Sequence, residues 1–190
     1  NKAPHLKACF DCLERQTISK SDLEVLLIDD GSTDESLALC EAFAAERPWV
    51  RVIAQSNAGV SEARNAGIRA ARGRYLFFLD PDDSLSPETL ENVSKFFESC
   101  PEEVELATYP IVSIRDGKRQ RLHHRYDVLR ETGVYDLTLP ENATIAQATM
   151  NVAVRNRFDG NVLFDFAPAN GVIVHEDEKY CTDVLQRSMQ

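Results

Sequence analysis

The chain has 190 residues, of which 43% are hydrophobic and 27% charged, and its formal net charge is −10. This length allows one domain whose core buries roughly 70% of the unfolded surface. The composition excludes a disordered chain, and no apolar run approaches the roughly 20 residues that cross a bilayer. Nucleic acid is not expected as a partner, because its binding depends on neutralising phosphates. An acidic excess fits a protein that holds divalent cations, but more often it marks only a solvated surface.

Helices and strands alternate over the first hundred residues. Helical stripes and short apolar runs predict, in chain order, a helix over 4–16, a strand over 24–29, a helix from 32, a strand over 50–54, a helix over 61–71, a strand over 75–79 and a helix from 86. Ser32 and Glu35 have the spacing of a capping box, and Ser86 precedes a proline that suits a first helical position. This rhythm predicts an α/β domain with a mainly parallel sheet and right-handed crossovers.

The pattern changes after residue 100. Residues 106–114 and 121–126 are predicted to be two strands, joined by a turn whose Asp-Gly pair suits a tight hairpin. Residues 127–160 show no readable pattern, and a last helix is expected from about 178 to 187. No repeat or linker is visible, so residues 1–190 are predicted to form a single domain.

Cysteine usage indicates a reducing, cytoplasmic setting. The chain has five cysteines, an odd number, and it is not small, so a disulfide framework is not expected. Cys9 and Cys12 have the C-x-x-C spacing of a redox pair or of half a zinc site. Cys9, however, shares one helical stripe with Leu6 and Leu13. We therefore expect both cysteines to pack in the core.

Acidic residues cluster where two predicted strands end. Asp29 and Asp30 end one strand, while Asp80, Asp82 and Asp83 follow another. In an open parallel sheet, ligands bind beyond the carboxyl ends of the strands. Crowded carboxylates repel one another unless a cation or a donor-rich ligand joins them, and hard divalent ions take such oxygen ligands and bridge to phosphates. Helix capping by aspartate explains one acid per helix, but not three within four residues.

Four motifs in one order and spacing carry a family resemblance. They are IDDGSTD at 28–34, NAGVS with ARNAGI at 57–61 and 63–68, GRYLFFLDPDD at 73–83 and HEDE at 175–178. Together they resemble the family 2 glycosyltransferases of the GT-A fold. The resemblance is close over residues 1 to about 100 and again over 175–187.

The resemblance implies a GT-A nucleotide-diphospho-sugar transferase fold, a mainly parallel sheet with helices on both faces and an antiparallel hairpin in the acceptor half. Residues 1–100 would form the nucleotide-sugar-binding half and residues 101–190 the acceptor-binding half. The family opens with a strand of the type V-S-V-I-I-P-x-Y-N, and Asn1 resembles the last residue of that motif. We therefore expect the central strand to precede this sequence, and the chain to be trimmed at both ends.

The resemblance also implies roles for the residues that bind the donor. Asp30 would accept a hydrogen bond from the imide N–H of uracil, which implies a UDP-sugar. Arg64 would lie near the diphosphate, although in isolation it also fits a surface helix arginine. Asp82 would bind the ribose hydroxyls and Asp83 the metal, Mn²⁺ or Mg²⁺, with Asp80 in support.

The same resemblance implies a catalytic base. Asp177 matches the carboxylate that takes a proton from the acceptor hydroxyl, with Glu176 beside it as a supporting acid. Asp29, next to Asp30 at the end of the predicted strand, is also expected to be a supporting acid. A single base with in-line attack gives inversion at the anomeric carbon. Without the resemblance, Asp177 fits an acid at a helix N-terminus equally well.

The leading interpretation is an inverting, metal-dependent hexosyl- or N-acetylhexosaminyl-transferase. Its acceptor would be a glycan, a lipid-linked molecule or a cell-surface polymer, and it would act in the cytoplasm or at the inner face of the membrane. The alternatives are a nucleotidyltransferase that makes nucleotide-sugars and a non-catalytic nucleotide-sugar-binding module. Basic residues between 115 and 125 would suit an anionic acceptor or peripheral membrane contact, but a solvated hairpin is the commoner reason for such a strip.

Overall fold

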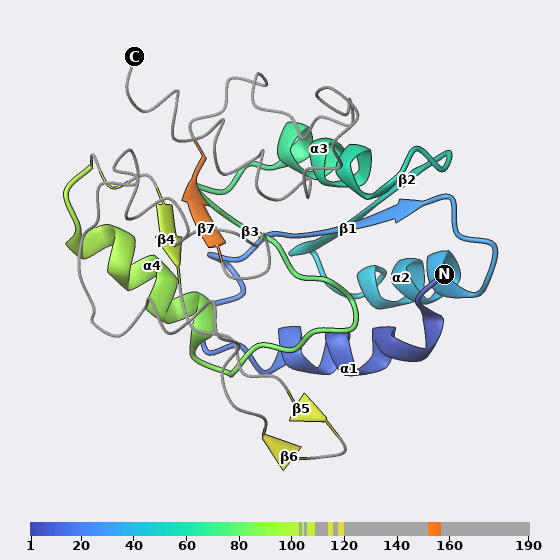
Figure 1. Cartoon of the computed structure of the whole chain (residues 1–190), viewed down its shortest axis with the longest axis horizontal. Helices are drawn as coiled ribbons and strands as arrows, with labels where there is room; N and C mark the ends of the chain where they lie inside the picture. The colour runs from blue at the N-terminus through green and yellow to red at the C-terminus, as the bar shows by residue number, and fades with distance from the viewer. Residues whose placement is uncertain (103, 105, 109–113, 116–117, 120–151, 157–190) are drawn as a thin grey trace.

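The computed structural model describes residues 1–102, 104, 106–108, 114–115, 118–119 and 152–156 (Figure 1). Its helices are α1 (Ala3–Glu14), α2 (Ser36–Ala44), α3 (Val60–Ala70) and α4 (Thr89–Ser99). Its strands are β1 (Val25–Asp30), β2 (Val50–Gln55), β3 (Tyr75–Phe77), β4 (Leu106–Thr108), β5 (Ile114–Arg115), β6 (Lys118–Arg119) and β7 (Val152–Arg155). The predicted alternation over the first hundred residues is confirmed. None of these described helices combines the length and the hydrophobicity needed to span a bilayer.

The strands form one parallel pair and two antiparallel sheets. β1 and β2 run parallel, in a register from Val25 opposite Val50 to Asp30 opposite Gln55. β7 lies between β3 and β4 and is antiparallel to both. β5 and β6 pair antiparallel, with Arg115 opposite Lys118, so a hairpin forms at the predicted place, with a second strand that begins earlier than expected. The predicted strand over 121–126 lies outside the described residues.

The predicted strand over 106–114 is described only in part. Leu106–Thr108 pairs with β7, a partner that the sequence analysis did not suggest, and Ile114–Arg115 forms one strand of the hairpin. β7 lies in the stretch that showed no readable pattern. Its pairing with residues more than forty positions away in sequence leaves no local turn signal, so a short apolar run, Val152 to Val154, was its only mark.

Two predicted helix starts were also wrong. α2 begins at Ser36, and no side chain caps its first turn. The backbone amide of Ser32 instead donates to Asp29 Oδ2 at 3.1 Å, and that of Ser36 donates to Asp34 Oδ1 at 3.0 Å. These residues therefore hold the loop after β1 rather than a helix end. α4 begins at Thr89, whose amide donates to the carbonyl of Ser86 at 3.1 Å.

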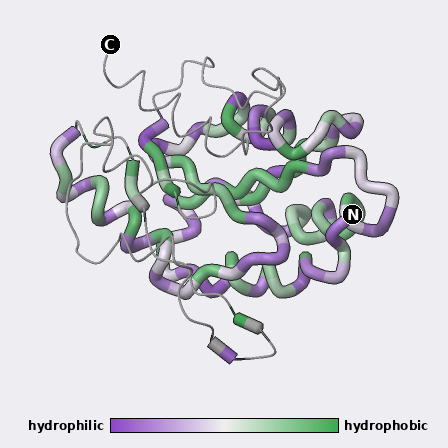
Figure 2. Tube along the Cα trace, in the orientation of Figure 1, coloured by the Kyte–Doolittle hydropathy of each residue, from purple (hydrophilic) through white to green (hydrophobic). Residues whose placement is uncertain are grey.

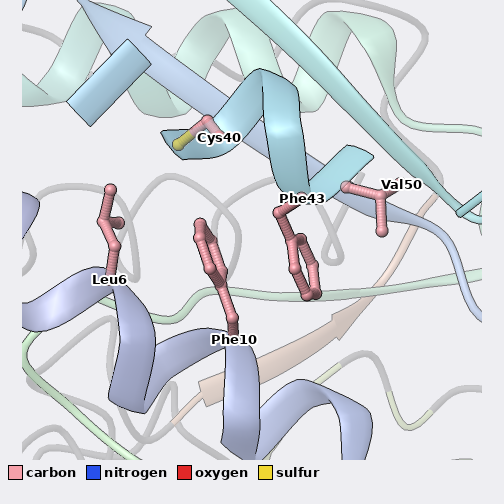
Figure 3. Close-up of a cluster of buried hydrophobic side chains, with 5 residues drawn as sticks. All are labelled: Leu6, Phe10, Cys40, Phe43 and Val50. Carbon is pink, nitrogen blue, oxygen red and sulfur yellow. The ribbon is translucent and has the colours of Figure 1, made fainter. Parts of the chain in front are cut away.

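The parallel strands lie between helices on both faces. α1 and α2 cover one face and α3 the other (Figure 1), and the most hydrophobic part of the trace runs through the strands (Figure 2). Figure 3 shows the core between α1 and α2, formed by Leu6, Phe10, Cys40, Phe43 and Val50. The rings of Phe10 and Phe43 stack with centroids 4.1 Å apart.

The two cysteines of the C-x-x-C pair lie in a second buried cluster. Cys9 and Cys12 pack with Leu13 against Leu79 and Leu85, and Cys12 has no exposed surface. The expectation that both cysteines belong to the core is confirmed.

A groove of about 890 Å³ lies between β1 and β3. Residues 23–28 line one wall and residues 73–81 the other, and side chains of α1, α3 and α4 complete the lining. β1 and β3 belong to different sheets.

Candidate active site

The loop after β3 holds three carboxylates together. The backbone amide of Asp83 donates to the carbonyl of Asp80 at 3.0 Å, so the chain turns back on itself between them. Partial removal of its carboxyl group from water raises the pKa of Asp83, and the charges of Asp80 and Asp82 raise it further. Like charges are thus held close to one another, an arrangement that a bound cation would relieve.

Two cationic side chains contact this acid loop. Lys2 Nζ lies 2.8 Å from Asp82 Oδ2, and this hydrogen bond holds the pKa of Asp82 below its ordinary value. Arg64 Nη2 lies 3.5 Å from Asp80 Oδ1, and its side chain is only 13% exposed. The structure therefore brings the predicted Arg64 to the predicted acids. Sequence reasoning missed Lys2, whose position before the first helix gave no sign of a contact eighty residues away.

Asp30 fastens the loop before α3 to the end of β1. Its Oδ1 accepts hydrogen bonds from Gln55 Nε2 and from the Ala58 amide, both at 2.8 Å, and its Oδ2 accepts one from the Gly59 amide at 2.7 Å. Burial acts to raise the pKa of Asp30, but these hydrogen bonds outweigh it and lower the pKa. Asp30 is therefore an ionised acceptor at neutral pH, and it positions the helix that carries Arg64.

The loop after β1 is held from both sides. Asp29 is buried and accepts the Ser32 amide at 3.1 Å. From the other side, the Asn1 side-chain oxygen accepts the amides of Thr33 at 2.7 Å and Asp34 at 3.3 Å. Asp29 thus supports the loop rather than facing a ligand directly.

Gly31 allows the close approach of the loop after β1 and the loop after β2. Its φ is +70°, and a Cβ added there would lie 2.7 Å from the backbone nitrogen of Asn57. The left-handed conformation disfavours any residue with a Cβ, and the backbone of Asn57 leaves no room for one.

We expect Gly31→Ala to lower the free energy of unfolding by about 1–3 kcal/mol, because a strained residue of this kind costs that much. Gly67→Ala is the matched control. Its Cβ would meet the Ile28 side chain at ordinary contact distances, 3.7 Å from Cγ1 and 4.0 Å from Cδ1. It also replaces a glycine inside α3, where alanine is the better helix former. Urea denaturation of both variants measures the effect. Equal stability of Gly31→Ala and the unchanged protein would contradict the described loop.

Asp177 and Glu176 lie outside the described residues. Their predicted roles, as base and as supporting acid, stay predictions. Of the predicted site, the structure joins Asp80, Asp82 and Asp83 with Arg64 in one cluster, and it places Asp30 at the end of β1.

The acid loop suits a metal that also takes ligands from a substrate. Within the described part of the chain, no group of three or more His, Cys, Asp or Glu side chains has the geometry to hold an ion. Mg²⁺ commonly takes one or two protein carboxylates and completes its shell with phosphate oxygens and water. The crowded carboxylates fit that chemistry. A bound cation would stabilise the ionised form of Asp83, whose pKa is raised by burial and by the charges of Asp80 and Asp82.

Comparison with known proteins defines the class. The model of the glycosyl transferase family 2 matches residues 1–168, so the chain belongs to this family. The resemblance found in the four motifs is confirmed.

Similar proteins include a teichoic acid biosynthesis protein and a chondroitin synthase. The minor teichoic acid biosynthesis protein GgaB of Bacillus subtilis (strain 168) is 39% identical over 183 residues, which cover 93% of this chain and 20% of that protein. Escherichia coli chondroitin synthase is 41% identical over 91 residues, which cover 48% of this chain and 13% of the synthase. The chain thus spans a fifth or less of the length of these relatives.

Solved structures share the fold. S. aureus TarS 1–349 in complex with UDP matches 97% of this chain and 52% of its own, with a TM-score of 0.77 and 20% identity. The mannosyltransferase PcManGT from Pyrobaculum calidifontis, in complex with GDP-Man and Mn²⁺, matches 97% of this chain and 49% of its own, with a TM-score of 0.69 and 21% identity. These likenesses confirm the expected GT-A fold.

Proposed function

We propose that this chain provides the donor site of an inverting, metal-dependent transferase that moves a hexosyl or N-acetylhexosaminyl group from a UDP-sugar to a cell-envelope polymer or its lipid-linked precursor. The observation that carries the proposal is the crowding of Asp80, Asp82 and Asp83 in one loop after β3 of a family 2 chain. Complexes of TarS with UDP and with UDP-GlcNAc support a uridine donor.

Four residues divide the recognition of the donor. Asp30 accepts three hydrogen bonds, one from Gln55 at the end of β2 and two from the loop before α3. A carboxylate can accept about four, which leaves one for the imide N–H of uracil. Asp82 accepts hydrogen bonds from the ribose hydroxyls. Asp83 would hold the metal, and the guanidinium of Arg64 would bind the phosphates.

The departure of UDP needs charge stabilisation. Bound to the diphosphate, Mn²⁺ or Mg²⁺ would supply it by neutralising the negative charge that gathers on the leaving group. The protein then needs one further group, a carboxylate base that takes the proton of the acceptor hydroxyl. We assign this role to Asp177, with Glu176 in support, and one base with in-line attack gives inversion.

The acceptor is proposed from the relatives. GgaB is named for the synthesis of a minor teichoic acid, which favours a cell-envelope polymer built in the cytoplasm or at the inner face of the membrane. Family membership favours a glycosyltransferase over a nucleotidyltransferase. The presence of Asp30, Asp82, Asp83 and Asp177 together favours an enzyme over a binding module.

Calorimetric titration with UDP, CDP and GDP tests the donor assignment. With Mn²⁺ present, we expect UDP to bind at least about tenfold more tightly than CDP, because one hydrogen bond to a charged group is worth about 1.5–3 kcal/mol and cytosine has no N3–H to donate. GDP is included because PcManGT, which shares the fold, forms a complex with GDP-Man. Weaker binding of GDP than of UDP would therefore be a property of this site and not of the fold. Equal affinities would reject the role of Asp30. Failure of all three to bind with Mn²⁺ would reject the proposed function.

A further inference from the structure

Lys2 is fastened beside the acid loop by its backbone. Its amide donates to Ser36 Oγ at 2.9 Å, and the Asn1 side chain before it accepts the Thr33 amide at 2.7 Å. The segment before α1 is thus tied to the loop after β1. From this anchor the Lys2 side chain reaches Asp82, where Nζ and Oδ2 lie 2.8 Å apart.

The ammonium group of Lys2 acts on all three carboxylates. Its hydrogen bond to Asp82 raises the pKa of Lys2 against the opposing effect of partial burial, and the charges of Asp80 and Asp83 raise it further. In return, the charge of Lys2 acts to lower the pKa of Asp83. Lys2, together with Arg64, is thus a counter-ion of the cluster in which Asp83 is the proposed metal ligand.

The contact between Lys2 and Asp82 is easily broken. Both side chains are 46% exposed, and ion pairs this open to water add little to stability. A ligand that hydrogen-bonds Asp82 can therefore displace Lys2 without disturbing the fold. The ribose hydroxyls assigned to Asp82 are such a ligand.

We propose that Lys2 makes metal binding depend on the nucleotide. Its ammonium group opposes the binding of a free divalent cation until the ribose hydroxyls replace Lys2 as the hydrogen-bond partners of Asp82. This inference rests on the proposed function. Three carboxylates give the cluster a charge of −3, and Lys2 with Arg64 brings it to −1. A free divalent cation is therefore only weakly attracted to the cluster, and the ammonium group of Lys2 repels it. The diphosphate brings negative charge and oxygen ligands of its own, so the metal enters with it.

The test measures Mn²⁺ binding without nucleotide, by the loss of the free-ion signal in electron paramagnetic resonance. We expect Lys2→Met to bind Mn²⁺ about tenfold more tightly than the unchanged protein, the size that Coulomb's law gives for a single and a double charge a few ångströms apart in water. Lys2→Arg keeps the charge and should bind like the unchanged protein. Lys7→Met is the matched control, because Lys7 forms a similar pair with Asp11, at 2.8 Å, elsewhere on α1.

Two further readouts sharpen the result. The gain in Lys2→Met should shrink in 1 M KCl, where screening acts over about 3 Å. UDP should also tighten Mn²⁺ binding by a smaller factor in Lys2→Met than in the unchanged protein. An unchanged Mn²⁺ affinity in Lys2→Met, or an equal gain in Lys7→Met, would overturn the inference. Failure of every variant to bind UDP would instead reject the proposed function, and the Mn²⁺ comparison would still be readable.

Discussion

Asp177→Asn is expected to lower kcat by about 10²–10⁴-fold, the usual contribution of general acid–base catalysis, and to leave the affinity for the UDP-sugar nearly unchanged. A base acts on a proton that moves in the transition state, so its loss changes turnover more than donor binding. Steady-state kinetics give kcat, and calorimetry with the UDP-sugar gives the affinity.

Substitution by asparagine distinguishes a catalytic from a structural role of Asp177. It keeps the size of aspartate and can still cap a helix, so a purely structural Asp177 predicts little change in either quantity. Transfer within a few-fold of the unchanged protein would reject Asp177 as the base, and with it inversion through a single carboxylate.

Asp83→Ala is expected to abolish the metal dependence of nucleotide binding. With Mn²⁺ present, the affinity for UDP should fall to the value measured in EDTA. The corresponding loss of Mn²⁺ affinity should reach at least about 100-fold, since changes merely to the partners of metal ligands cost about 10–100-fold.

The stability of the metal-free Asp83→Ala protein is the second part of this prediction. Asp80 and Asp82 repel an ionised Asp83, so its removal should leave the melting temperature unchanged or slightly higher at neutral pH. Glu46→Ala, which removes an exposed acid at the end of α2, controls for net charge. A large fall in the melting temperature of Asp83→Ala without metal would mean that Asp83 holds the fold rather than the ion.

Local patterns predicted the parallel half of the fold well. A continuous apolar run is enough to mark a strand buried on both faces, and β1 and β2 appear within a residue of their expected bounds. Helix starts were less certain because their signals are ambiguous. A serine followed three residues later by glutamate suits a cap, but the Ser32 amide donates to Asp29, and Asn1 accepts the amides of Thr33 and Asp34. The local sequence shows Asp29 but gives no sign of the contact with Asn1.

Long-range contacts account for what the sequence did not predict. Asp30 was assigned to the nucleotide from its motif, yet three donors between Gln55 and Gly59 converge on it, and only the pairing of β1 with β2 brings them there. Lys2 reaches Asp82 for the same kind of reason. The acids of the loop after β3 were predictable, because Asp80, Asp82 and Asp83 follow a short continuous apolar run that marks a buried strand.

Release of UDP is the most direct test of sugar transfer. The protein that contains this chain should be incubated with a set of UDP-sugars and cell-envelope polymer acceptors, in Mn²⁺ and in EDTA, while UDP and pyrophosphate are both measured. We predict release of UDP from at least one UDP-sugar that requires both Mn²⁺ and acceptor and is lost in Asp83→Ala. Formation of pyrophosphate in place of UDP, or binding of UDP with no release from any donor, would contradict a glycosyltransferase.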